Sequence, residues 1–284
     1  MTGRSEARYH GRSLSSWLED LDNEKPVEVR EHAKAVLTEA AIKAAPKFIH
    51  TLRAKDSKLK LLVIALAQRQ NLVNIGFRTA DMRREQAVRD FSSFRVGAIP
   101  VLANLLKDPA LAVHAVRTLN GTGPEAAAHL IRALEHTNYL VRDSAAVGLD
   151  SIYQNCVRFE NLVTQHQGWQ GTFPTNAVVA ALVSHLKDNT PNVRVNVAFA
   201  LGNMREQPEI VVPALTECLK ETSNSRLRQT VADALGKYAH DAISAVPSLQ
   251  PLVYDKDPMV RSTAERALKK INGREQRDSN ETSK

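Results

Sequence analysis

Apolar residues recur along the chain in groups. Counted from the first apolar residue of a group, the others follow four, seven, eight and eleven positions later, which is the spacing of one face of an α-helix. The stretch DPMVRSTAERALKKI shows the pattern most plainly, with its apolar stripe at Val260, Ala264, Ala267, Leu268 and Ile271. Four other stretches carry the same stripe, and they begin at Val29, Val141, Val193 and Leu227. The pattern predicts a series of amphipathic helices that each have one face to bury.

An arginine follows the first apolar residue of every stripe. These arginines are Arg30, Arg142, Arg194, Arg228 and Arg261, and the last three are 34 and 33 residues apart. Another amphipathic segment precedes each stripe, as in IVVPALTECLKE, and short polar turns such as DNTPN separate the two. A fixed period of this length with two helices in each period predicts helical hairpins, which stack because one hairpin cannot bury both of its faces.

The repeated phrases resemble those of the HEAT-repeat family of armadillo-like α-solenoids. The resemblance rests on the Asp-x-x-x-Val-Arg turn at 257–261 and on the Ala-Leu-Gly step at 234–236, and it covers about residues 13–272. The opening YHGRSLSSWL, at 9–18, is similar to the opening of a group of bacterial HEAT-repeat proteins that are mostly unassigned in function. The resemblance implies an all-α fold, a right-handed α-solenoid of about seven to eight HEAT-like hairpins whose second helices line the concave face.

We expect three regions along the chain: an N-terminal extension over 1–12, the solenoid over 13–272 and a disordered tail over 273–284. Two interruptions are expected inside the solenoid, near 71–95 and near 155–176, where the repeat becomes irregular. A second hairpin is expected at about 46–70, with Lys60 in the position of the arginine. Trp17 lies with Leu14, Leu18 and Leu21 on a first helix after Ser13, a typical N-cap, and is expected to cover the open end of the stack.

In HEAT repeats the recurring arginine generally pairs with an aspartate in the turn of its own or a neighbouring repeat. The resemblance therefore implies an arginine ladder, and the turn aspartates that could join it are Asp108, Asp188, Asp255 and Asp257. A guanidinium can form two parallel hydrogen bonds to a carboxylate, which lysine cannot copy. Regular recurrence favours this structural role over the alternative, a basic stripe that binds an acidic ligand.

The charge excess is concentrated in one segment. The chain has a formal net charge of +7, and residues 53–95 contain ten basic and four acidic residues, a difference of +6. The basic residues that we select as binding candidates are Lys58, Lys60, Arg78, Arg83, Arg84 and Arg89. A basic and irregular insertion favours contact with phosphate, an acidic protein or an anionic membrane, and the alternative is a solvated face that binds nothing.

The second interruption is polar, contains several glycines and carries Trp169 and Phe173. Loops of this length in a compact array are uncommon and are often binding elements, so the two aromatic side chains could anchor a partner. The alternative is that they fold back and cover a gap in the stack. The sequence leaves both interpretations open.

The sequence contains none of the catalytic motifs that we searched for. It has no glycine-rich phosphate loop after a strand, no Gly-x-Ser-x-Gly, no His-Glu-x-x-His and no His-Glu dipeptide of the kind that di-iron HEAT-like enzymes use. Its two cysteines, Cys156 and Cys218, are too few for a disulfide framework or a four-cysteine metal site. We therefore expect no enzyme, no cofactor and no metal.

These observations predict a scaffold, monomeric and non-enzymatic, that binds another protein through its concave face and the two irregular segments. The alternative is a nucleic-acid-binding HEAT-like module, of the DNA base-excision type, that uses the basic 53–95 segment. The start of the chain has no apolar signal-peptide core, and the longest aliphatic run, at 61–67, is too short to span a membrane. We expect a soluble, cytoplasmic protein without a membrane span, or an exported one if a leader has been removed.

Overall fold

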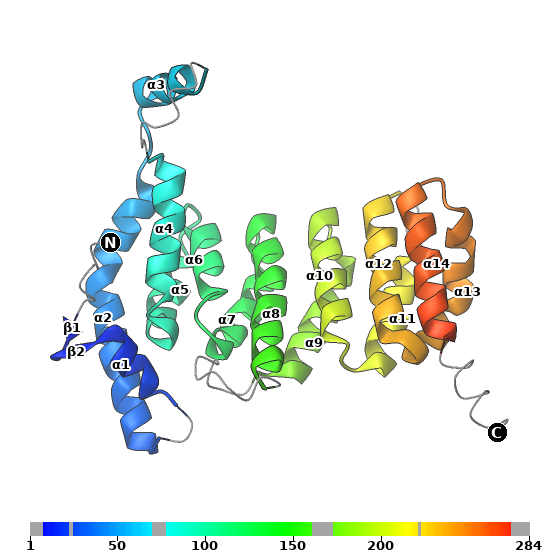
Figure 1. Cartoon of the computed structure of the whole chain (residues 1–284), viewed down its shortest axis with the longest axis horizontal. Helices are drawn as coiled ribbons and strands as arrows, with labels where there is room; N and C mark the ends of the chain where they lie inside the picture. The colour runs from blue at the N-terminus through cyan, green and yellow to red at the C-terminus, as the bar shows by residue number, and fades with distance from the viewer. Residues whose placement is uncertain (1–7, 23–24, 70–77, 161–172, 221–222, 274–284) are drawn as a thin grey trace. The chain divides into compact units, whose positions relative to one another are not determined.

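The protein is an all-α solenoid, and its described residues include one small β-hairpin near the start of the chain. The computed structural model describes residues 8–22, 25–69, 78–160, 173–220 and 223–273. The chain divides into two compact units, residues 1–126 and 127–284, and each is described by itself (Figure 1). No helix in the described ranges is long and apolar enough to cross a membrane.

The first unit begins with the YHGRSLSSWL segment, which folds into a hairpin and a short helix. Strands β1 (Arg8–Tyr9) and β2 (Arg12–Ser13) pair antiparallel, and Gly11 takes a φ of 79° in the turn between them. Helix α1 (Leu14–Glu19) follows, and the Ser13 side chain accepts a hydrogen bond from the Ser16 amide, which confirms the expected N-cap. Glycine is suited to the turn because it adopts positive φ without steric cost.

Trp17 is buried, as its position predicted, in a cluster with apolar residues of the next helix, α2 (Val27–Arg53). Its indole nitrogen donates a hydrogen bond of 2.8 Å to the Tyr9 carbonyl. The Arg12 guanidinium lies 4.2 Å from the centre of the Trp17 ring. The opening phrase therefore forms the surroundings of Trp17: Tyr9 accepts its hydrogen bond, Gly11 makes the turn and Arg12 covers its ring.

The second hairpin differs from the expectation for 46–70. Helix α2 runs without interruption through Pro46, and helix α4 (Ala80–Ser92) packs beside its C-terminal half, where Phe48 and Phe91 stack with ring centres 4.1 Å apart. Helix α3 (Lys58–Arg69), the expected partner, leaves Leu59 and Leu62 exposed. The expected hairpin is wrong because α4, from further along the chain, occupies the position beside α2.

The rest of the first unit returns to short helices joined by tight turns. Four elements follow α4 in order: η1 (Arg95–Ala98), α5 (Ile99–Leu105), α6 (Ala112–Leu119) and η2 (Pro124–Ala126). At Gly97 an added Cβ would lie 2.5 Å from the carbonyl carbon of Leu37, so only glycine permits this approach to α2. The core of the unit forms where α4, α5 and α6 meet around buried residues such as Leu102 and Leu119.

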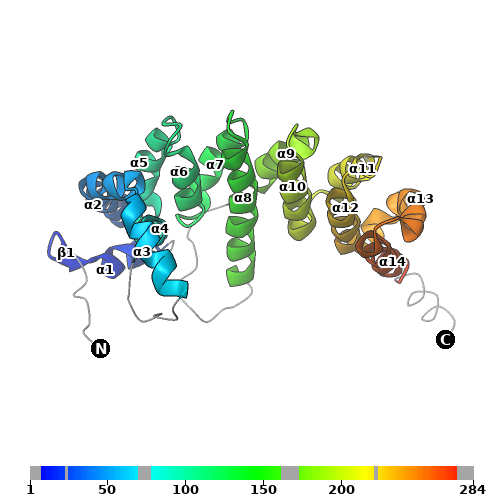
Figure 2. The same ribbon diagram turned by 90° about the horizontal axis from the view of Figure 1, so that it is seen from above.

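The second unit contains four successive helical hairpins within its described residues. The first helices are α7 (Ala127–Leu134), α9 (Thr175–Ser184) with η3 (His185–Lys187), α11 (Pro208–Cys218), and the run η4 (Ala239–Ala245), α13 (Val246–Leu249) and η5 (Gln250–Tyr254). The second helices are α8 (Tyr139–Glu160), α10 (Pro191–Met204), α12 (Ser225–Tyr238) and α14 (Pro258–Asn272). The four second helices stand side by side in chain order and form one row. The first helices α9, α11 and α13 form a second row beside it (Figures 1 and 2).

Small residues let the second helices of this unit approach one another closely. An added Cβ at Gly202 would lie 2.5 Å from the Cβ of Ala234, and one at Gly236 would lie 2.9 Å from the Cα of Ala267. The stripes predicted from the sequence are buried in all four helices, except that Leu268 is only half-buried. Val29 in α2 is likewise half-buried. The burial of the stripes confirms the prediction that the hairpins hide their apolar faces against one another.

The two expected interruptions are partly helical. Helix α8 continues to Glu160 and α9 begins at Thr175, so both ends of the 155–176 segment are ordered as helix. Within 71–95, residues 80–92 form α4. Residues 70–77, 161–172 and the expected tail over 274–284 lie outside the described residues, and Trp169 lies outside with them.

Candidate functional site

The arginines that recur in the sequence join neighbouring repeats of the second unit. The Arg142 guanidinium on α8 donates two hydrogen bonds to the Asp188 carboxylate in the next turn, from Nε at 2.7 Å and from Nη2 at 2.9 Å. The Asp188 carbonyl in turn accepts a hydrogen bond of 2.8 Å from Arg194 on α10. One arginine therefore holds the side chain of the turn aspartate, and the next arginine holds its main chain.

The same arrangement recurs two hairpins further along the unit. Arg228 on α12 donates two hydrogen bonds to Asp255, at 2.7 and 3.0 Å, and Arg261 on α14 donates one of 2.8 Å to the Asp255 carbonyl. The Arg228 side chain is only 4% exposed, and its hydrogen bonds hold the pKa of Asp255 below the ordinary value. Because these guanidinium groups face aspartates inside the stack, they support the repeat and are not presented as a basic stripe.

The other predicted members of the ladder have different positions. Asp257 accepts a hydrogen bond from the Met259 amide and so caps α14. Asp108, in the first unit, forms an ion pair of 3.0 Å with Arg53. Arg30 lies half-buried in the first turn of α2. The fork to a following turn is therefore seen at Arg142 and Arg228.

Two of the four carboxylates of the basic 53–95 segment form ion pairs inside the segment. Asp56 forms ion pairs with Lys60 at 2.7 Å and with Arg83 at 3.3 Å. The hydrogen bond from Lys60 is the main cause that lowers the pKa of this carboxyl. Arg84 pairs with Asp81 at 2.8 Å and also donates a hydrogen bond to the Ala54 carbonyl.

The remaining binding candidates of this segment lie at the surface. Lys58 and Arg78 are exposed, and Arg89, also exposed, donates a hydrogen bond of 3.0 Å to the Gln86 side chain. The six candidates lie on α3, on α4 and on the residues just before α4, and the structure brings only Lys60 and Arg83 together, at Asp56. The ion pairs engage Lys60, Arg83 and Arg84, but the net charge of the segment stays at +6, because its four carboxylates are already counted in that value.

Of the two aromatic candidates in the second interruption, Phe173 is the one that the structure describes. Its ring packs edge-on against the buried Tyr153 of α8, with ring centres 5.6 Å apart. The Tyr153 hydroxyl donates hydrogen bonds to the Met204 carbonyl and to the Glu206 carboxylate. Phe173 therefore helps to cover a bonded core tyrosine, which is the covering role that the sequence left open for it.

A continuous surface that the sequence reasoning did not select runs along the second helices of the second unit. We call it the second-helix face, and its residues are Asp143, Val147, Asp150, Gln154, Asn196, Phe199, Asn203, Asp233, Lys237, Arg266 and Lys270. Its polar members bond from helix to helix: Asn196 donates to Asp143 at 2.7 Å and Asn203 donates to Asp150 at 2.9 Å. These bonds fix the positions of polar side chains along one surface.

Two apolar side chains lie in the middle of this face. Phe199 is 48% exposed and Val147 is exposed to a similar degree. They occupy the same level of α10 and α8, because Asn196 and Asn203, which flank Phe199, bond to Asp143 and Asp150, which flank Val147. The Lys237 ammonium lies 4.9 Å from the centre of the Phe199 ring and so presents a cation to its face.

The face becomes hollow at the C-terminal ends of α10 and α12. The hollow has a volume of 460 Å³ and is lined by Gln154, Asn203, Arg205, Lys237, Lys270 and the small residues Gly202, Gly236 and Ala239. Lys237 donates a hydrogen bond of 2.8 Å to the Asn203 side chain at its wall. The polar groups that line it are therefore three cations and two amides.

Asp150 lies beside the hollow and is largely buried. Burial raises the pKa of its carboxyl above the ordinary value, although the hydrogen bonds from Asn203 and Gln154 lower it. Both amides are thus oriented by this carboxyl group. No group of three or more metal-binding side chains exists on this face or elsewhere in the described ranges.

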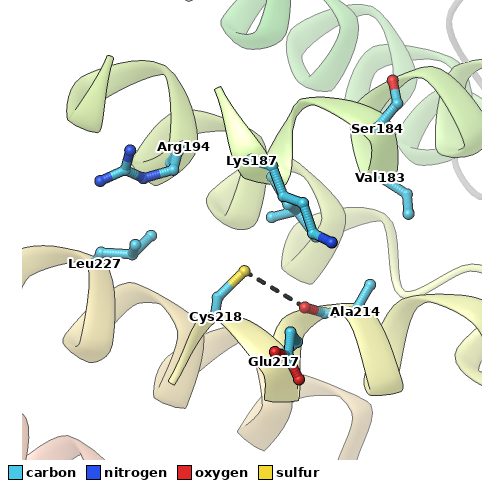
Figure 3. Close-up of a pocket in the computed structure, with 9 residues that line it drawn as sticks. Val183, Ser184, Lys187, Arg194, Ala214, Glu217, Cys218 and Leu227 are labelled. Atoms are coloured by element: carbon cyan, nitrogen blue, oxygen red, sulfur yellow. Dashed lines mark hydrogen bonds between the residues drawn. The ribbon is translucent and has the colours of Figure 1, made fainter. Parts of the chain in front are cut away.

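A second hollow lies on the other side of the same unit, between the first helices (Figure 3). It has a volume of 570 Å³, and its walls carry Lys187, Glu217 and Cys218 together with apolar side chains such as Leu227. The Cys218 thiol donates a weak hydrogen bond of 3.4 Å to the Ala214 carbonyl of its own helix. This hollow combines two cations, Lys187 and Arg194, with one anion and a thiol that is bonded within its helix, an arrangement that selects no ligand class.

The sequence held one signal for the second-helix face that spacing alone could have found. Its residues lie on the side of each second helix opposite the buried stripe, and Phe199 is the apolar exception on the polar side of α10. An aromatic residue on the wrong side of an amphipathic helix is a typical mark of a contact surface. Phe199 lies out of register with the buried stripe of α10, so the helical period of the apolar residues does not include it.

The comparisons with known proteins agree with the repeat architecture. Residues 179–269, a stretch that contains α10, α11 and α12, match the family model described as HEAT repeats. The comparison with curated proteins found no match.

Several solved structures of engineered repeat proteins are similar to the chain. A crystal structure of an engineered protein is 20% identical, covers 92% of this chain and 96% of its own, and has a TM-score of 0.49. A designed armadillo repeat protein in complex with the peptide (KR)4 is 18% identical, covers 76% and 100%, and has a TM-score of 0.47. Computationally designed armadillo repeat proteins for modular peptide recognition are 17% identical, cover 92% and 100%, and have a TM-score of 0.48. At these values, no statement about the ligand of this chain follows from them.

Proposed function

We propose that the protein is a non-enzymatic scaffold that binds a segment of another protein along the second-helix face. The observation that carries the proposal is the pair Phe199 and Val147, two half-exposed apolar side chains at the centre of a bonded polar surface. Apolar anchors surrounded by polar groups are typical of protein-binding sites, in which a few central residues supply most of the binding energy.

The rigidity of the surface supports this function. The asparagine bonds to Asp143 and Asp150 and the hydrogen bond from Lys237 to Asn203, at 2.8 Å, connect three successive helices. A partner that binds such a face does not have to order these side chains, so less conformational entropy is lost on binding. The predicted contacts through the 71–95 and 155–176 segments stay predictions.

Protein binding is favoured over nucleic-acid binding by the charges that the structure pairs. Asp56, Asp81 and Asp108 form ion pairs with Lys60, Arg83, Arg84 and Arg53 of the basic segment. Nucleic-acid affinity depends on free cations that replace counterions at phosphates, and these pairs reduce their number. The aromatic residues Phe91 and Phe94, which could stack on bases, are buried in the first unit.

The test is affinity capture from the native host with two matched variants. Phe199→Glu places a charge at the centre of the second-helix face. Ile210→Glu places the same charge on α11, at a side chain that is also 48% exposed. We expect proteins that are captured by the wild type and by Ile210→Glu to be lost with Phe199→Glu. Retention of every captured protein by Phe199→Glu would contradict the proposal, provided that circular dichroism shows both variants folded.

A further inference from the structure

The hollow at the end of the second-helix face collects cations from three different segments. Lys237 comes from α12, Lys270 from α14 and Arg205 from the left-handed residue that ends α10, with a φ of 55°. Arg205 and Lys270 are exposed, whereas Lys237 is half-buried. Three positive charges around one cavity repel one another, and a neighbouring carboxylate or a bound anion lowers the energy of the arrangement.

The nearby carboxylates do not fill this need. No carboxylate lines the hollow among the described residues. Asp150 is bonded to Asn203 and Gln154, Asp233 is shared between Lys237 at 3.0 Å and Arg266 at 3.8 Å, and Glu206 accepts from Tyr153. Within the described residues, the Arg205 and Lys270 side chains have no carboxylate within ion-pair distance. Two of the three cations therefore line the hollow without a carboxylate partner among the described residues.

Helix ends do not account for the arrangement. Lysine in the last turn of a helix interacts favourably with the helix dipole, which applies to Lys237 in α12 and to Lys270 in α14. The carbonyl groups at the end of α10 already have donors: the Tyr153 hydroxyl bonds the Met204 carbonyl, and the Gln154 amide bonds the Asn203 carbonyl. The dipole explains one lysine on each helix, but it does not explain why they meet Arg205 at one cavity.

We propose that this hollow binds an acidic side chain of the partner segment that lies on the second-helix face. The inference rests on the proposed function and specifies the chemistry of the partner. Phe199 lies one helical turn from Asn203 at the wall of the hollow, a rise of about 6 Å along α10. Since an extended segment advances about 3.3 Å per residue, one apolar and one acidic residue two positions apart reach Phe199 and the hollow together. The partner is an acidic peptide with an apolar residue at that spacing.

The direct test measures binding of a defined probe. A fluorescein-labelled peptide of glutamates around one phenylalanine is titrated with the full chain by fluorescence anisotropy at low salt, and the same peptide with glutamines replaces it as a control. We expect the glutamate peptide to bind more tightly than the glutamine peptide. Its affinity should fall at least ten-fold with Arg205→Glu/Lys270→Glu. Equal affinity for both peptides, or no binding of the glutamate peptide at millimolar concentration, would overturn the proposal.

A charge-matched variant separates the hollow from the overall charge of the protein. Lys187→Glu/Lys220→Glu makes the same change in net charge on two lysines of the first-helix side, both exposed. We expect this variant to bind the glutamate peptide as the wild type does. An equal loss of affinity in both double variants would assign the effect to net charge and contradict a site at the hollow.

The two proposals fail in different ways. If the captured partner is lost with Phe199→Glu but kept by Arg205→Glu/Lys270→Glu, the second-helix face binds the partner and the acidic contact is wrong. If Phe199→Glu keeps every partner, the proposed function itself is wrong. Loss of the partner in both variants, with retention by Lys187→Glu/Lys220→Glu, supports both.

Discussion

Two aspartates of this protein each bind an arginine, in regions that differ in almost every other respect. Asp255, in the second unit, receives two hydrogen bonds from Arg228 of the preceding hairpin, and the Arg228 side chain is 4% exposed. Asp56, in the first unit, is shared between Lys60 and Arg83, and the Arg83 side chain is 41% exposed and makes a single contact of 3.3 Å. The same residue types thus form a buried joint between repeats in one place and a partly solvated cluster in the other.

The difference teaches that the environment of an ion pair, more than its presence, decides its contribution to stability. Exposed pairs contribute little because water and salt screen them and long side chains lose entropy on pairing. A buried pair is costly to break, because removal of one partner leaves the other charge without compensation in a poorly solvated site. In the sequence, the recurring arginine after an apolar residue indicates buried ion pairs, whereas the dense charges of 53–95 indicate exposed ion pairs.

The largest effect is expected from Arg228→Ala. The variant leaves the Asp255 carboxylate buried without its two donors, and the expected loss is about 4 kcal/mol of the free energy of unfolding. The loss should concentrate in α12 and α14, because a repeat protein loses stability near the altered interface. Hydrogen exchange of the two helices, together with urea unfolding, measures it.

The control for this prediction is Arg83→Ala, which removes the exposed member of the Asp56 cluster and leaves Lys60 paired. Its urea midpoint should stay close to the wild-type value. A shift as large as that of Arg228→Ala would show that exposure does not separate the two regions. Arg228→Lys should recover only part of the loss, since an ammonium cannot form the fork.

The next effect concerns the apolar stripe. Leu227 precedes Arg228 and is fully buried, so Leu227→Ala should cost about 3 kcal/mol through lost burial and the cavity left behind. The measurement is the free energy of unfolding from urea titration. A cost near zero would mean that the stripe is not packed between hairpins as the structure has it.

A smaller effect is expected from acid. The hydrogen bonds from Arg228 lower the pKa of Asp255 in the folded protein, so its contribution to stability is present above the ordinary pKa and is lost as the pH falls through the lowered value. The urea midpoint should therefore decrease below about pH 4, the ordinary range for aspartate. The double variant Arg228→Met/Asp255→Leu removes this titration, and its midpoint should decrease less over the same range. Parallel curves for the two proteins would contradict the assignment.

The smallest effect is expected at Leu59, which precedes Lys60 just as Leu227 precedes Arg228. Because Leu59 is 71% exposed on α3, Leu59→Ala should change the free energy of unfolding by less than about 0.5 kcal/mol. A cost similar to that of Leu227→Ala would show that α3 packs as the second helix of a regular hairpin.

The repeat itself could be predicted from the sequence because a helix that hides one face must repeat its apolar residues at the helical period. The residues that follow from this argument, Val193, Leu227 and Val260 among them, are buried. Local capping was equally predictable: Ser13 caps α1 through the amide of Ser16, a residue only three positions away. Such contacts depend on the chain within a few residues.

The candidate site was not predictable in the same way. The bonds between Asn203 and Asp150 and between Lys237 and Asn203 join residues 53 and 34 positions apart. They depend on how far one helix is shifted along its neighbour, and the spacing of a stripe does not contain that shift. The hollow with its three cations is a consequence of the same shift.

By itself, the sequence determined the all-α class, the period of the hairpins and the faces that they bury, since these follow from helical geometry and the burial of apolar surface. The tertiary structure decided which helix packs beside the C-terminal half of α2, where α4 and its Phe91 lie against Phe48 and α3 keeps its leucines exposed. It also decided which carboxylates pair with the cations of the basic segment and which described cations line the hollow. The physical reason is that burial is encoded residue by residue along a helix, whereas pairing depends on the distance between helices that the chain brings together only when it folds.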